Sequence, residues 1–315
     1  MRSLLVVLLA LLCPAAGAGP LRVFVSVLPQ KTFVERVGGP AVDVQVMVQP
    51  GASPHTYDPI PRQVAALAEA DLYVAVGVRF EDAWMERIRA ANPRIRILDT
   101  SRGIDLRAME APDDDDHGHP GGEASGAGLG EQGQPPSGAG QAPVQGPRDP
   151  HLWTSPPLVK QMAAAIRDAL AALDPTNGAA YAANYAAFAA ELDALDREIR
   201  ARLAGLSERR FMVFHPAWGY FADTYGLTQV PIEREGKEPG PRALATLIDQ
   251  ARREGIKTIF VQPQFSHKAA AQVAKAIGGE VAMLDPLAPD YIENLRRAAA
   301  ALAAGSARPR LETQP

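Results

Sequence analysis

Three histidines stand in loops where a predicted helix begins, and an aspartate occupies a related position. His215 follows the apolar run 211–214, which predicts a short buried strand, and precedes Pro216, whose fixed φ suits the first turn of a helix. His55 and His151 likewise lie in loops just before helix starts marked by proline, and Asp285 follows another buried strand. In open α/β sheets, ligands bind beyond the carboxyl ends of the strands, where such loops meet. The pattern therefore favours one shared site for a divalent metal ion.

These side chains have the right chemistry for zinc, but they form no local motif. A neutral imidazole is the commonest protein ligand for zinc, and a tetrahedral site takes three or four ligands. His55 and His151 come from the first half of the chain, whereas His215 and Asp285 come from the second. The residues alone leave a second interpretation open, in which His215 and Asp285 cap helices and His151 packs inside its loop.

The N-terminus has the pattern of a cleavable secretory signal. Arg2 precedes the apolar run 4–12 and the small residues 16–18, so we expect residues 1–18 to be removed after Ala18. The apolar run is too short to span a bilayer, and no later segment reaches the roughly 20 apolar residues that a spanning helix needs. We therefore expect an exported, soluble, periplasmic protein.

Cysteine and charge exclude several classes of protein. Cys13 is the only cysteine and lies in the signal, so disulfides and thiolate metal sites are both excluded in the mature chain. Removing residues 1–18 takes away Arg2 and leaves 31 cationic against 36 anionic side chains, a net charge of −5. No basic stripe with interleaved aromatics indicates a nucleic-acid partner.

The order of predicted elements indicates an α/β protein with two similar lobes. Strand and helix patterns alternate in both halves, which favours two mostly parallel sheets flanked by helices. A longer helical pattern between the halves predicts one rigid connecting helix. The expected organisation is an N-terminal lobe over 19–172, a linking helix over 173–206, a C-terminal lobe over 207–305 and a frayed tail over 306–315. Within the first lobe, the Gly-, Pro- and acid-rich segment 112–148 predicts a disordered loop that carries His117 and His119.

Four motifs in order along the chain resemble one protein family. They are Pro54-His55-Thr56-Tyr57-Asp58-Pro59, Asp149-Pro150-His151-Leu152-Trp153, Phe214-His215-Pro216-Ala217-Trp218-Gly219-Tyr220-Phe221, and Phe260-Val261-Gln262-Pro263-Gln264-Phe265-Ser266 followed by Leu284-Asp285-Pro286-Leu287. Together they resemble the metal-binding solute receptors of ABC importers, in particular the ZnuA-like zinc receptors, over nearly the whole mature chain.

This resemblance implies a function, a partner and a ligand set. It implies a receptor, not an enzyme, that binds a transported ion between two lobes and delivers it to an ABC permease. It also implies that His55, His151, His215 and Asp285 are the ligands, with Asp285 replaceable by water or a neighbouring acid. Manganese-type members usually carry a glutamate where His215 stands, so three imidazoles favour Zn²⁺ over Mn²⁺. We expect a monomer.

Several expectations about the site remain to be tested. Asp58, Asp149 and Glu233 are candidate acceptors that would orient the imidazoles. Because protons compete for the ligands, metal affinity should fall as the pH drops through the histidine range. The rival classes are a secreted zinc hydrolase, for which no His-Glu-x-x-His helix is present, and an adhesin or metal buffer that acts without a transporter.

Overall fold

The computed structural model describes residues 19–110, 147–233 and 237–305. The predicted signal, most of the predicted loop 112–148 with His117 and His119, and the predicted tail lie outside the described residues. Within the described ranges, no helix has the length and apolar character needed to cross a membrane.

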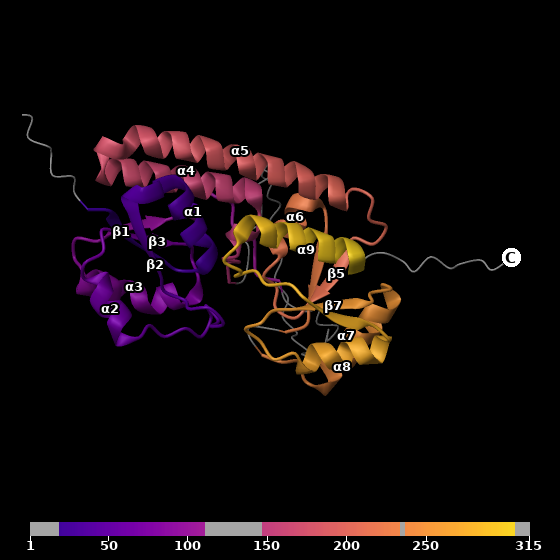
Figure 1. The fold of residues 1–315 in the computed structure, drawn as a ribbon. Helices are drawn as coiled ribbons and strands as arrows, with labels where there is room; N and C mark the ends of the chain where they lie inside the picture. The colour runs from indigo at the N-terminus through magenta and orange to yellow at the C-terminus, as the bar shows by residue number, and fades with distance from the viewer. Residues whose placement is uncertain (1–18, 111–146, 234–236, 306–315) are drawn as a thin grey trace, which may run out of the picture.

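The first lobe is built on a parallel four-stranded sheet in the order β2-β1-β3-β4. Every residue of β3 is buried, as expected for a strand covered on both faces. The helices that connect the strands lie beside this sheet (Figure 1). The elements are β1 (Leu21–Val25), α1 (Leu28–Gly38), η1 (Gly39–Ala41), β2 (Val42–Val46), α2 (Pro61–Leu67), β3 (Leu72–Ala75), α3 (Arg79–Ala91) and β4 (Arg96–Asp99).

The second lobe repeats this topology with the order β6-β5-β7-β8, again fully parallel. The first strand of each lobe, β1 or β5, lies second in the order of its sheet. The carboxyl ends of β1 and β5 therefore occupy equivalent places. The elements are β5 (Arg210–Val213), α6 (Gly219–Tyr225), β6 (Thr228–Pro231), α7 (Pro241–Arg253), β7 (Thr258–Val261), α8 (Lys268–Ile277), β8 (Glu280–Met283) and α9 (Tyr291–Gly305). The α/β fold class expected from the sequence, with two parallel sheets and one long helix, is confirmed.

A helical layer joins the two lobes. After η2 (Leu152–Thr154), helix α4 (Pro156–Leu173) runs into η3 (Pro175–Asn177) and then into α5 (Gly178–Leu203), a 26-residue helix. At about 1.5 Å per residue, α5 is roughly 39 Å long, and it extends above both lobes (Figure 1). It packs against α1 and α4 on one side of the molecule and against α6 and α9 on the other.

One apolar core runs through both lobes and the helical layer. The buried cluster extends from Val23 in β1, through Phe188 and Leu195 in α5, to Leu302 in α9. A second cluster lies between the β5–β7 face and helices α7 and α8. Because interiors are close-packed and resist deformation, a shared core opposes a wide hinge motion between the lobes.

The loop between β8 and α9 bonds directly to the first lobe. The Trp153 indole Nε1 donates to the Pro286 carbonyl at 2.8 Å, and the Thr32 hydroxyl donates to the Pro289 carbonyl at 3.1 Å. These contacts fix the edge at which the loops of the two lobes meet.

Two helices begin later than the sequence pattern predicts. We expected a helix from Pro216, but α6 begins at Gly219, after a turn in which the Ala217 N–H donates to the His215 carbonyl at 2.8 Å. In the first lobe, Asp58 and Pro59 have the sequence pattern of the helix start after His55, but α2 begins at Pro61. His215 therefore lies in an irregular segment between strand and helix and does not cap α6.

Candidate metal centre

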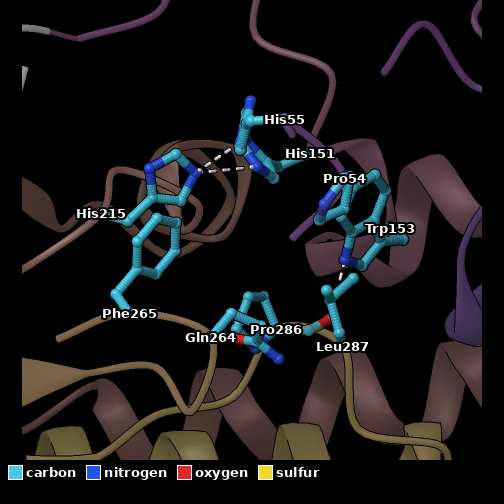
Figure 2. A pocket seen from close by; sticks show the side chains of 9 residues that line it. All are labelled: Pro54, His55, His151, Trp153, His215, Gln264, Phe265, Pro286 and Leu287. Carbon is cyan, nitrogen blue, oxygen red and sulfur yellow. Dashed lines mark hydrogen bonds between the residues drawn. The ribbon is translucent and has the colours of Figure 1, made fainter. Parts of the chain in front are cut away.

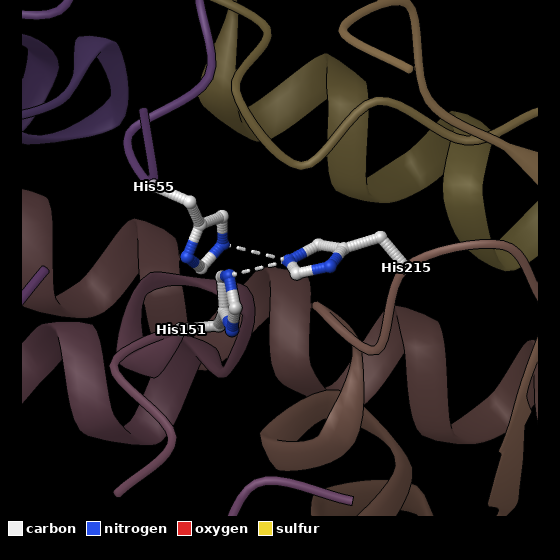
Figure 3. A group of neighbouring side chains, drawn as sticks. All are labelled: His55, His151 and His215. Carbon is white, nitrogen blue, oxygen red and sulfur yellow. Dashed lines mark hydrogen bonds between the residues drawn. The ribbon is translucent and has the colours of Figure 1, made fainter. Parts of the chain in front are cut away.

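The three histidines predicted as ligands converge on one point between the lobes. His55 comes from the β2–α2 loop, His151 immediately precedes η2, and His215 lies two residues beyond β5. The Nε2 atom of His215 is 2.9 Å from Nε2 of His55 and 3.4 Å from Nε2 of His151. One ligand nitrogen from each ring lies within 4.8 Å of the others, so this group could hold a metal ion (Figure 3).

Two of the imidazoles are oriented by buried carboxylates. The Nδ1 atom of His151 is 2.7 Å from Asp149 Oδ1, and Nδ1 of His215 is 2.6 Å from Glu233 Oε1. Both carboxylate side chains are buried. Since an ionised carboxylate only accepts hydrogen bonds, these contacts assign the ring proton to Nδ1. The lone pair of each Nε2 then faces the centre of the group, as a metal ligand requires.

Hydrogen bonds among the three rings cannot provide a partner for every Nε2 atom. With Nδ1 protonated on both His151 and His215, each Nε2 is an acceptor, so their 3.4 Å contact contains no donor. His55 can donate to only one of them. A cation at the centre satisfies all three lone pairs at once.

Burial keeps the rings of His55 and His215 in the neutral form. Burial, with smaller contributions from His215, His151 and Arg79, lowers the pKa of His55 to about 2. Burial also lowers the pKa of His215, although Glu233 opposes this effect. Both imidazoles are therefore neutral, with one ring proton each, at neutral pH even when no metal ion is bound.

The cavity between the rings is small and largely apolar. Its volume is about 10 Å³, close to the space that one water molecule occupies. Phe265 stacks on His215 with ring centroids 4.8 Å apart, and Trp153 meets His151 edge-on at 5.2 Å. The lining residues, shown in Figure 2, are Pro54, His55, His151, Trp153, His215, Gln264, Phe265, Pro286 and Leu287. Such a cavity suits a single ion without a full hydration shell.

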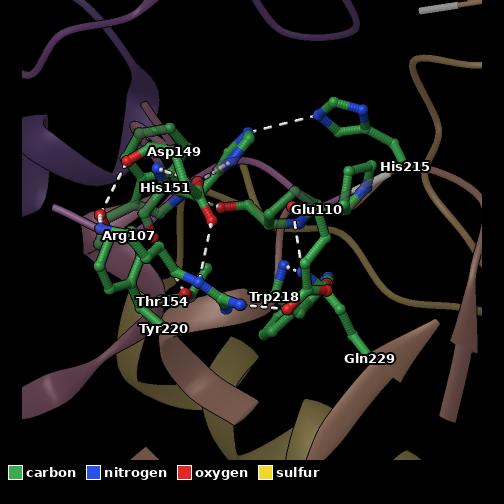
Figure 4. A network of polar contacts seen from close by, with 12 residues as sticks. Arg107, Glu110, Asp149, His151, Thr154, His215, Trp218, Tyr220 and Gln229 are labelled. Carbon is green, nitrogen blue, oxygen red and sulfur yellow. Dashed lines mark hydrogen bonds and ion pairs between the residues drawn. The ribbon is translucent and has the colours of Figure 1, made fainter. Parts of the chain in front are cut away.

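A polar network behind His151 holds Asp149 in place (Figure 4). Arg107 forms an ion pair with Glu110, and its Nε lies 4.0 Å from Asp149 Oδ2. The Tyr220 hydroxyl donates to the Asp149 carbonyl at 2.8 Å. Gly219 packs closely against this network, because a Cβ at residue 219 would overlap the Arg107 guanidinium and displace it. The role of Arg107 could not be predicted from the sequence, since an isolated arginine outside any motif carries no signal of such a role.

Two other predicted residues, Asp285 and Asp58, have hydrogen-bond partners other than the three imidazoles. Asp285 is not a member of the group of three within the described residues. Its Oδ1 accepts from Gln264 Nε2 at 3.1 Å and from the Leu287 N–H at 2.9 Å, which makes it a local cap of the β8–α9 loop. The expectation that Asp58 orients an imidazole is not met, because Asp58 Oδ1 accepts from Trp84 Nε1 at 3.0 Å.

Curated relatives of this chain include zinc-binding and zinc-uptake proteins. High-affinity zinc uptake system protein ZnuA of Bacillus subtilis is 27% identical over 271 residues, which cover 85% of this chain and 78% of that protein. Zinc-binding protein AdcA of Streptococcus pyogenes serotype M3 is 27% identical over 276 residues, which cover 85% of this chain and 51% of AdcA. The chain thus spans about half the length of the streptococcal AdcA relatives.

Solved structures show the same fold. A crystal structure of ZnuA aligns with a TM-score of 0.79 and 39% identity over 91% of this chain and 100% of that chain. The laminin-binding protein Lmb of Streptococcus agalactiae aligns with a TM-score of 0.74 and 26% identity, over 91% and 100% of the two chains.

The sequence model of one family spans most of the chain. It is described as zinc-uptake complex component A, periplasmic, and it matches residues 23–305. That description is of a component of an uptake complex and not of an enzyme. The chain therefore belongs to the ZnuA family of periplasmic zinc-uptake components.

Proposed function

We propose that this protein is a periplasmic receptor that captures Zn²⁺ with His55, His151 and His215 and delivers it to an ABC permease. The observation that carries the proposal is the convergence of three Nε2 atoms within 4.8 Å, two of them on rings whose Nδ1 contacts a buried carboxylate. The names of the relatives, which are zinc-binding and zinc-uptake proteins, support zinc as the ion.

The donor set favours zinc over manganese. Imidazole nitrogens suit Zn²⁺, whereas Mn²⁺ prefers carboxylate, carbonyl and water oxygens and usually six of them. A cavity of about 10 Å³ walled by Phe265 and Trp153 leaves little room for additional water ligands.

For the fourth ligand we propose Asp285, with a water molecule as the alternative. Asp285 is bonded to Gln264, and Gln264 lines the same cavity as the three histidines. Because Gln264 and the Leu287 N–H both donate to Oδ1, we propose that Asp285 ligates zinc through Oδ2. Asp285→Asn keeps an oxygen that can accept the bonds from Gln264 and the Leu287 N–H, but an amide is a weaker zinc ligand than a carboxylate. A loss of zinc affinity with unchanged stability would therefore support Asp285 over water as the fourth ligand.

The decisive experiment measures zinc binding by the mature protein purified without chelator. Native mass spectrometry should show one Zn²⁺ per chain, retained when Mn²⁺ is added in excess. His215→Ala should lose most of the affinity, whereas His267→Ala, the described histidine outside the group, should keep it. Unchanged zinc affinity in His215→Ala would refute the proposed site.

The geometry also bears on a hydrolytic alternative. A zinc hydrolase needs a general base beside the metal-bound water. In the described part of the chain, two carboxylates contact the rings directly. Asp149 contacts Nδ1 of His151, and Glu233 contacts Nδ1 of His215, so both face away from the metal-binding nitrogens. We therefore expect no hydrolysis of ester or peptide substrates by the zinc-loaded protein, and zinc-dependent turnover would overturn the receptor assignment.

Export, domain limits and oligomeric state complete the proposal. The mature chain would begin at Gly19, with lobes over 19–172 and 207–305 joined by the helix region 173–206. We propose that it acts as a monomer. N-terminal sequencing of the exported protein tests cleavage after Ala18, and light scattering with and without zinc tests the monomer.

A further inference from the structure

The side chain of Gln262 holds the backbone of His215. The strands β5 and β7 end at Val213 and Val261, and the Phe214 N–H still donates to the Phe260 carbonyl at 2.8 Å. Beyond that point, Gln262 Oε1 accepts from the His215 N–H at 3.2 Å, and Gln262 Nε2 donates to the His215 carbonyl at 2.7 Å. A side-chain amide therefore continues the pairing of the strands where their backbones separate.

The local sequence explains why a side chain is needed here. His215 is buried, so its N–H and carbonyl groups must find partners inside the protein. Strand β5 ends at Val213 and α6 begins only at Gly219, so neither element supplies an acceptor for the His215 N–H. A primary amide carries both an acceptor and a donor, and Gln262, at 1% exposure, uses both on the same residue.

Other contacts control the ring of His215 once its backbone is fixed. Glu233 contacts Nδ1 at 2.6 Å, and Phe265, three residues after Gln262, stacks on the ring at 4.8 Å between centroids. These two contacts set the rotation of the ring, but neither sets the position of its Cα atom. Among the described residues, only the Gln262 amide bonds the backbone of His215 itself from the direction of β7.

We propose that Gln262 is a positioning residue for zinc, which sets the affinity by fixing the backbone from which His215 reaches the ion. This inference rests on the proposed function, because it concerns the same ion. Gln262 does not touch the ion, and its amide does not titrate. It acts by keeping His215 Nε2 within reach of the nitrogens of His55 and His151.

In the first lobe, another buried glutamine amide bonds the chain just beyond β1, at residues that are not metal ligands. Gln30 Oε1 accepts from the N–H groups of Ser26 and Val27 at 3.0 and 3.1 Å, and its Nε2 donates to the Val74 carbonyl at 3.2 Å. Val27 lies two residues after β1, as His215 lies two residues after β5. Gln30 has 0% exposure. It is therefore a matched control for burial and side-chain chemistry, although it lies in α1 whereas Gln262 follows β7.

The test compares Gln262→Met with Gln30→Met in the full mature chain. Methionine keeps the approximate length and volume of glutamine but neither bonds the backbone in this way nor carries a charge. Three measurements are made on each variant: zinc affinity by competition with a chromophoric chelator, the visible absorption spectrum with Co²⁺ in place of zinc, and the urea midpoint without metal.

We expect both variants to lose stability but only one to lose metal binding. Gln262→Met should weaken zinc by about 10- to 100-fold, the usual effect of removing a group that orients a ligand, and should change the Co²⁺ spectrum. Gln30→Met should leave the zinc affinity and the Co²⁺ spectrum unchanged. Zinc affinity and a Co²⁺ spectrum equal to those of the wild type in Gln262→Met, or equal losses of affinity in both variants, would overturn the inference.

Two further arms keep the outcome interpretable. If Gln262→Met does not fold, Gln262→Glu is read by the same criteria, because glutamate keeps the shape but loses the Nε2 donor to the His215 carbonyl. Failure of the wild type to bind zinc would refute the proposed function. Normal binding by the wild type and by Gln262→Met, with loss in His215→Ala, would refute only the role of Gln262.

Discussion

The burial of His55 predicts how the stability of the metal-free protein depends on pH. Its pKa is about 2 in the folded protein, against the ordinary value of 6.5. Below pH 6.5 the unfolded chain binds a proton at this residue and the folded protein does not. The contribution of His55 to stability is therefore fully present above pH 6.5 and is lost progressively as the pH falls from 6.5 towards 2.

The size of this effect follows from linkage. Between pH 8 and pH 5, protonation of the unfolded chain at His55 should lower the free energy of unfolding by about 2 kcal/mol. His55→Gln removes the titrating group while keeping a polar side chain of similar size. The difference in unfolding free energy between wild type and His55→Gln should therefore change by about 2 kcal/mol across this range.

Urea unfolding monitored by tryptophan fluorescence, in EDTA at pH 8, 7, 6 and 5, measures this difference. Parallel pH profiles for the two proteins would refute the reasoning, because they would mean that His55 titrates alike in both states. An imidazole NMR signal of folded, metal-free protein that titrates near pH 6.5 and is assigned to His55 would refute it independently.

The same pKa values modify our expectation for zinc. We expected affinity to fall as the pH drops through the ordinary histidine range. Because burial depresses the pKa of His55 and of His215, proton competition at these two rings is displaced to lower pH. The zinc affinity of the folded protein should therefore change less between pH 7 and pH 6 than that of an exposed three-histidine site.

Three further predictions concern the ligand supports, the core and the packing behind the site. Glu233→Gln should weaken zinc binding by about 10- to 100-fold, as measured by chelator competition, and unchanged affinity would contradict its orienting role. Leu195→Ala, in the buried face of α5, should cost about 2–5 kcal/mol in one cooperative urea transition for both lobes; two separate transitions would contradict a shared core. Gly219→Ala should lower both the melting temperature and zinc affinity because its Cβ would displace Arg107, whereas Gly205→Ala, with open space around its Cβ, should leave both unchanged.

The sequence predicted the elements of the fold because local patterns determine them. The apolar runs over 72–76 and 258–261 predict buried strands, and β3 and β7 are found there. Proline placed the helix starts less well: α6 begins at Gly219 because the segment after His215 first forms a turn. Local preference alone cannot specify such a turn, since Gln262 and Gln229, which are distant along the chain, add bonds to the local one from Ala217.

The sequence by itself determined which residue types stand at the sheet edges: His55, His151 and His215 each lie in a loop at an element boundary. Only the tertiary structure decided that their Nε2 atoms meet, because the distance between loops depends on how the two lobes pack across α5. It also decided that Asp149 and Glu233 orient the rings, while Asp58 bonds Trp84 and Asp285 bonds Gln264. An acidic residue has the same sequence signature in each of these roles, and its partner depends on segments that folding brings together.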